Sequence, residues 1–137
     1  MRYWLFKSEP SAWSWDQQVK AGAKGTGWTG VRNHLAKQNM MAMMVGDHGF
    51  FYHSNDGKEM VGIVEVIHAF HPDPTDETGK FGMVDLKAVR PLKRSVTLAE
   101  VKTIPALKDM SLLTSARLSV QPVTAKEWDF ILKLSER

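Results

Sequence analysis

Polar groups that could take part in chemistry stand at two places where hydrophobic stretches end. Lys7 and Ser8 follow the aromatic stretch near the start of the chain, and Pro10 closes it because proline has no amide hydrogen for a sheet. His53 and Ser54 end a second hydrophobic stretch. If the two strand ends converge, a hydroxyl and an imidazole could act as nucleophile and base. Polar strand ends in contact with water are the alternative interpretation.

A second candidate site is the segment from Trp28 to Asn33. Trp28 lies on a glycine-rich loop ahead of a predicted helix, where its ring could form an aromatic wall. Arg32 and the free N–H groups of a helix N-terminus favour an anion such as phosphate. Asn33 offers a donor and an acceptor, which matches the edge of a base. Alternatively, Trp28 packs on the helix and Asn33 caps it.

A third candidate lies near the end of the chain, at Arg117, Leu118 and Ser119. In a strand, Arg117 and Ser119 share one face while Leu118 points to the other. A cation beside a hydroxyl is typical of a phosphate contact. A structural ion pair of Arg117 explains the pattern equally well.

Motifs for catalysis and for metal binding are missing. The chain has no cysteine, no GxSxG elbow, no HExxH, no P-loop and no dinucleotide fingerprint. Ser8 and His53 also have no third group that would orient the imidazole. We therefore expect no catalytic residue, no metal and no cofactor. The residues that could be enlisted as metal ligands show no ligand spacing: Asp47, His48, His53, His68, His71 and Asp73.

The hydrophobic pattern predicts the elements that must position these groups. Strands are expected at 3–6, 49–54, 60–70, 81–89 and 117–123, and helices at 15–21, 31–44, 106–110 and 124–134, with a short one opening at Thr97. Val31, Leu35, Met40 and Met44 form the expected apolar face of the second helix. Short turns between strands favour an α+β fold, with an antiparallel sheet of about five or six strands curled into a small barrel.

Length and composition indicate one intracellular domain. The chain has 137 residues, so we expect a single domain over 1–137. A sequence without cysteine, without a membrane-length apolar run and without a signal peptide predicts a cytoplasmic protein with no membrane partner. The net charge of +3 permits an anionic partner without requiring one. We expect a monomer.

Several segments, in order along the chain, resemble the EVE domain family, which includes the thymocyte nuclear protein group. They are YWLFKSEP at 3–10, WTGVRN at 28–33, GDHGFFYHS at 46–54, VGIVEV at 61–66, RLSV at 117–120 and PVT at 122–124 with Glu127-Trp128. The resemblance implies a PUA-like fold, similar in architecture to YTH domains. One departure is His34–Lys37, where the family more often has a Gln/Tyr-Ala-Arg stretch, so an arginine on the phosphate path is missing.

The resemblance also implies a function: binding of a modified nucleobase in DNA or RNA, without a reaction on it. Trp28 would stack on the base and Asn33 would lie near its edge. The remaining residues would form one wall, the mouth and floor of the pocket, and the phosphate contacts: Lys7, Ser8, Pro10, Arg32, His53, Ser54, Arg117, Leu118 and Ser119.

Two other functions stay open at this point. One is an enzyme of the hydrolase or nucleotide-processing type that uses Ser8 and His53. The other is a pocket for a peptide or a small metabolite. Binding of modified against plain oligonucleotides separates these possibilities.

Overall fold

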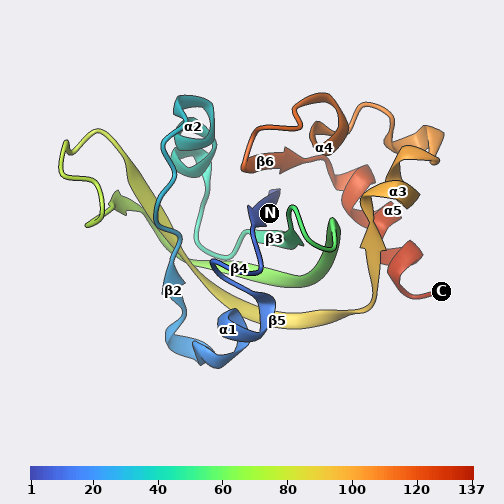
Figure 1. Cartoon of the computed structure of the whole chain (residues 1–137), viewed down its shortest axis with the longest axis horizontal. Coiled ribbons are helices and arrows are strands. Elements are labelled where there is room, and N and C mark those ends of the chain that lie inside the picture. The colour runs from blue at the N-terminus through green and yellow to red at the C-terminus, as the bar shows by residue number, and fades with distance from the viewer.

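The computed structural model describes all residues from 1 to 137 and contains one curved sheet with helices on both sides (Figure 1). The sheet has six strands in the spatial order β2-β5-β4-β3-β1-β6. Their bounds are β1 Tyr3–Ser8, β2 Thr26–Gly27, β3 His48–His53, β4 Glu59–Pro72, β5 Gly82–Thr97 and β6 Val120–Val123. The predicted α+β class is confirmed, and the strand number lies within the predicted range.

The sheet is mixed and open, which corrects the prediction of an antiparallel, barrel-like sheet. β1 runs parallel to β3, with Lys7 opposite Tyr52, whereas the other neighbouring strands are antiparallel. The terminal strands of the order, β2 and β6, do not pair with each other. The parallel pair arises because two helices lie between β1 and β3, and a crossover of that kind returns the chain in its original direction.

The fifth strand is longer than predicted, since it continues past Val89 to Thr97. Pro91, inside the added part, lies where the register of the β4–β5 pairing shifts, between Met60 and Gly62 of β4. A proline is tolerated at such an irregularity because the missing amide hydrogen interrupts a ladder that is already broken.

Side-chain caps determine where the main helices begin. The helices are α1 Trp15–Lys20, α2 His34–Ala42, α3 Leu98–Lys102, α4 Ser111–Thr114 and α5 Ala125–Ser135, with 3-10 turns η1 Gly22–Lys24 and η2 Pro105–Leu107. Ser14, Thr97 and Thr124 each form a capping box with the residue three positions later, and the short helix expected to open at Thr97 is present. None of the helices has both the length and the apolar character needed to span a bilayer.

Helix α2 is shorter than predicted and presents a different face to the core. Its buried residues are Ala36 and Met40, while Leu35 is 52% exposed and Met44 is 69% exposed. Val31 lies before the Asn33 cap and Met44 lies beyond the last helical residue, Ala42, so neither belongs to the helix. Leu35 lies inside the helix but points about 100° away from its neighbour Ala36, which is buried. The predicted apolar face was therefore wrong at Leu35 and Met44.

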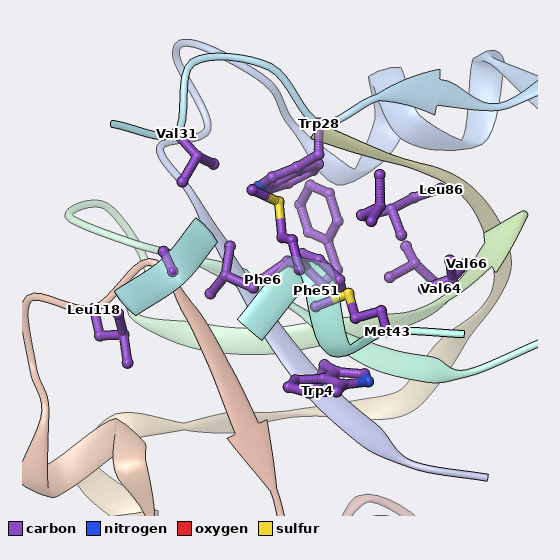
Figure 2. Packing of buried hydrophobic residues seen from close by; sticks show 14 of the residues in the cluster. Trp4, Phe6, Trp28, Val31, Met43, Phe51, Val64, Val66, Leu86 and Leu118 are labelled. Atoms are coloured by element: carbon purple, nitrogen blue, oxygen red, sulfur yellow. The ribbon is translucent and has the colours of Figure 1, made fainter. Parts of the chain in front are cut away.

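The sheet separates two hydrophobic cores, because consecutive strand residues point to opposite faces. Trp4 and Phe6 enter one core, which α2 covers, and Leu5 enters the other, which contains residues of α3, α4 and α5. Figure 1 shows α2 standing at one end of the curved sheet and α3 to α5 gathered at the other. Figure 2 shows the first core, in which Trp28 lies at the top of the view and Trp4 at the bottom, with Phe6 and Phe51 between them.

Candidate functional site

A cavity of about 550 Å³ opens beside the first core, within the usual size range of small-molecule sites. It is built from the end of β1, the loop before α1, β2 with the segment that follows it, the start of β5 and the residue before β6. The lining residues are Lys7, Ser8, Ala12, Trp13, Thr26, Gly27, Trp28, Thr29, Gly30, Val31, Arg32, Met83 and Ser119.

Trp28 belongs both to the core and to the wall of the cavity. It is 7% exposed and meets Phe6 and Phe51 edge-on, with ring centroids 5.5 Å and 5.7 Å away. Its amide donates to the carbonyl of Val84 at 2.9 Å. The indole is therefore held in one orientation before any ligand arrives, as a stacking surface requires.

Trp13 is a second aromatic lining residue, and sequence reasoning missed it. Its indole N–H donates to Oε1 of Gln18 at 2.8 Å, and the buried Gln18 donates in turn to the carbonyl of Leu86 at 3.0 Å. The ring is thus oriented by a buried amide that is fixed to β5. No spacing in the sequence separates Trp13 from Trp15, which packs against Phe51.

The end of β1 brings Ser8 to the cavity beside the chain just before β6. The Ser8 hydroxyl donates to the carbonyl of Trp13 at 2.7 Å, and the amide of Lys7 donates to the carbonyl of Ser119 at 2.9 Å. Nζ of Lys7 donates to the carbonyl of Ala116 at 2.6 Å, and burial lowers the pKa of Lys7. Ser8 and Ser119 therefore line one cavity from distant parts of the chain.

Arg32 lines the cavity while it is held by the loop that follows β4. Its guanidinium donates to Oδ2 of Asp73 at 3.2 Å and to the hydroxyl of Thr75 at 3.0 Å. The Arg32 side chain is 39% exposed. The guanidinium also donates to the carbonyl of Val31 at 3.1 Å. Because a guanidinium has five N–H groups, two remain for an anionic ligand.

Asn33 and the end of β3 stabilise neighbouring elements and do not line the cavity. Oδ1 of Asn33 accepts the amide of Ala36 at 2.9 Å, which is the capping role. Nε2 of His53 accepts the amide of Trp15 at 3.1 Å, and the amide of Ser54 donates to the Ser8 carbonyl at 2.9 Å.

His53 is bound in a form that requires a neutral ring, since Nε2 acts as an acceptor. Burial lowers the pKa of His53, against an opposing influence of Glu59 and Asp16. No hydrogen bond joins His53 to the Ser8 hydroxyl, which is engaged with Trp13. The two groups do not form a nucleophile–base pair in this structure.

The remaining predicted site residues lie outside the cavity lining. Pro10 is half-buried in the turn after β1, and Leu118 is buried in the first core. Arg117 is exposed and forms no ion pair, so the alternative of a structural salt bridge is not found. Of the segment from 117 to 119, only Ser119 reaches the cavity.

The histidines and acidic residues do not gather into a ligand set for a metal ion. No group of three or more such side chains is placed to hold one. Asp85 accepts hydrogen bonds from His68 at 2.6 Å and from His71 at 2.9 Å. Although burial raises the pKa of Asp85, these two imidazoles lower it below its ordinary value.

Comparison with known proteins gives a consistent result. The family model of the EVE domain matches residues 2–134. Thymocyte nuclear protein 1 of Mus musculus is 37% identical over 166 aligned positions, covering 98% of this chain and 74% of the mouse protein. The NMR structure of Rpa0253 from Rhodopseudomonas palustris is 61% identical, with a TM-score of 0.94, and the match covers 99% of this chain and 94% of that one.

Two further solved structures contain a nucleic acid. The human THYN1 protein in complex with DNA containing 5-methylcytosine is 36% identical, with a TM-score of 0.92, and the match covers 100% of this chain and 99% of that one. The YTH domain of Zygosaccharomyces rouxii MRB1, in complex with N6-methyladenosine RNA, is 21% identical with a TM-score of 0.59, covering 99% and 85% of the two chains. The second likeness is one of fold alone, and it confirms the predicted similarity in architecture.

Proposed function

The chain belongs to the EVE domain family, and we propose that it binds a modified nucleobase of DNA or RNA without reacting with it. The observation that carries this proposal is a cavity lined by two oriented tryptophans, Trp13 and Trp28, and by the polar residues Ser8 and Ser119. A flat apolar ligand with polar edges matches such a lining. The similarity to the human THYN1 protein, whose structure contains 5-methylcytosine DNA, supports the same ligand class.

The mechanism follows from where the groups lie. A base leaves the stack, or comes from a single strand, and enters the cavity beside Trp28. Stacking on an aromatic side chain contributes roughly 1–3 kcal/mol per base. Because every base has a flat face, stacking does not discriminate, and discrimination falls to the edge contacts of Ser8 and Ser119. Arg32 holds backbone phosphate with the N–H groups that Asp73 and Thr75 leave free.

Binding without turnover is supported by how the candidate catalytic groups are engaged. The hydroxyl of Ser8 donates to the carbonyl of Trp13, and the imidazole of His53 accepts the amide of Trp15. A nucleophile needs its base within hydrogen-bond reach. We also propose that the protein is a monomer and that it is cytoplasmic, because a sequence without cysteine fits a reducing compartment.

The first experiment is a titration of the protein against oligonucleotides that differ in one modified base, with the plain sequence as reference. We compare the wild type with Trp28→Phe and use Trp15→Phe as the matched control. Trp15 is 9% exposed and meets Phe51 edge-on at 5.5 Å, as Trp28 does, but it does not line the cavity.

The expected result is a loss of affinity specific to Trp28. Trp28→Phe should raise the Kd for the modified oligonucleotide about tenfold, because a smaller ring gives up part of the stacking energy. Trp15→Phe should lower thermal stability to a similar degree and leave the Kd unchanged. Equal Kd values for the wild type and Trp28→Phe would rule out base stacking on Trp28. Turnover of an oligonucleotide that is lost in Ser8→Ala would favour the enzyme.

A further inference from the structure

The wall of the cavity between β2 and α2 belongs to no helix or strand. Over Trp28 to Arg32, the amide of Trp28 donates to Val84 and that of Thr29 donates back to Gly27. The amide of Gly30 reaches across the structure to Oδ2 of Asp73, at 2.8 Å. Gly30 has a φ of +84°, a backbone conformation that residues with a side chain rarely adopt, so glycine is favoured at this contact.

Asp73 holds this wall with one carboxylate oxygen and its own loop with the other. Oδ2 accepts the amide of Gly30 and the guanidinium of Arg32. Oδ1 accepts the amide of Thr75 at 2.7 Å and the Thr75 hydroxyl at 2.6 Å. Asp73 is 2% exposed, and every one of these contacts satisfies a charge that would otherwise be costly to bury.

Asp73 contacts two residues that line the cavity but does not line the cavity itself. Gly30 and Arg32 both line the cavity, whereas Asp73 does not. In Figure 1 the loop between β4 and β5 extends from the end of the sheet on the same side as α2.

Burial raises the pKa of Asp73, but hydrogen bonds from Thr75, Gly30 and Arg32 outweigh it and keep the pKa below the ordinary value. The carboxylate is therefore charged at neutral pH.

We propose that Asp73 is a positioning residue of the cavity, which sets the Gly30 backbone and the Arg32 guanidinium where a ligand meets them. For the ligand, this inference rests on the proposed function. The positioning itself does not, because all of its contacts lie within the chain. The loop between β4 and β5 thereby affects the affinity of the cavity for its ligand. None of the residues between Pro72 and Met83 lines the cavity.

The first test is hydrogen exchange of individual backbone amides in the ligand-free protein. In Asp73→Ala, the Gly30 amide should exchange at least about tenfold faster than in the wild type, since it loses its only acceptor. The Trp28 amide, which donates to Val84, should keep its protection. Asp73→Asn retains a side-chain oxygen and should lie between the two. Unchanged protection of Gly30 in both variants overturns the proposal.

The matched control is Asp47, another buried carboxylate that accepts backbone amides. It accepts the amides of Arg2 and Met44 and the indole N–H of Trp4, and it does not line the cavity. Asp47→Asn should lower the melting temperature without changing the exchange of Gly30. If Asp47→Asn exposes Gly30 as much as Asp73→Asn does, Asp73 acts only through general stability.

The second test measures binding of a DNA oligonucleotide containing 5-methylcytosine, at a temperature where all variants are folded. Asp73→Asn should raise the Kd about tenfold, the equivalent of about 1.4 kcal/mol, while Asp47→Asn leaves it unchanged. If the wild type does not bind this DNA, the proposed function fails for that base, and the exchange experiment still decides the positioning. If the wild type does bind, a Kd that is unchanged in Asp73→Asn contradicts the inference.

Discussion

At the scale of single residues, most polar groups near the cavity have structural partners. Ser8 donates to Trp13, His53 accepts from Trp15, and Lys7 donates to Ala116. Trp28 packs against Phe6 and Phe51 in T-shaped contacts that fix the orientation of its ring. A site built in this way is preorganised, so little of the binding energy is spent on ordering side chains.

His53 gives a prediction about pH. Its pKa is lowered in the folded protein, chiefly by burial, so the folded state binds a proton less readily than the unfolded chain. The stabilisation is therefore complete above the unfolded value of about 6.5 and is lost as the pH falls through the lower folded value. We expect the free energy of unfolding to decline over that range.

The measurement is chemical denaturation at a series of pH values. In His53→Gln, a side-chain oxygen can still accept the amide of Trp15 but does not titrate in this range. The variant should lack this part of the decline. A wild type and a His53→Gln protein with the same pH dependence would show that His53 is not the responsible group.

At the scale of elements, a substitution of Asn33 tests whether this residue only caps α2 or also contacts the base. Its side chain accepts the amide of Ala36 and starts α2. Asn33→Ala should cost about 1 kcal/mol of stability, as caps usually do, and leave the ratio of modified to plain binding unchanged. Thr124→Ala, which removes the cap of α5 on the other core, is the matched control. Loss of selectivity in Asn33→Ala alone would assign Asn33 to the base.

The elements also show which features the sequence could predict. The three capping boxes and the aromatic strand β1 are local patterns, and the structure contains them. The face of α2 was predicted wrongly, because Val31 and Met44 lie outside the helix that Asn33 caps, and the buried residues inside it are Ala36 and Met40. Trp13 and Asp73 were missed as site residues for a different reason: their roles depend on Gln18, Gly30 and Arg32, which they meet only in the folded chain.

At the scale of the whole molecule, the net charge of +3 predicts a modest dependence of binding on salt. Phosphate contacts release counterions and therefore weaken with salt, whereas the contacts that recognise a modification do not. Raising the salt concentration should weaken binding of modified and plain oligonucleotides equally. Their affinity ratio should stay constant.

Arg117 provides the variant for this experiment. It is exposed, has no ion-pair partner and lies two positions before Ser119, which lines the cavity. Arg117→Gln should reduce the slope of log K against log salt by about one for both oligonucleotides. Lys102→Gln, an exposed substitution on α3, should leave the slope unchanged. A change confined to the modified oligonucleotide would place Arg117 at the base.

The position of β1 between β3 and β6 has a consequence for synthesis of the protein. During synthesis β1 is made well before Val120–Val123, with which it pairs, and before Ser119, whose carbonyl accepts the amide of Lys7. The second edge of β1 is therefore covered only after the long segment between β1 and β6 has been made, and contacts so distant in sequence slow folding. Until then an apolar, aromatic strand has an open edge, which is a hazard for association between nascent chains. The cavity is complete only after the C-terminal segment has emerged.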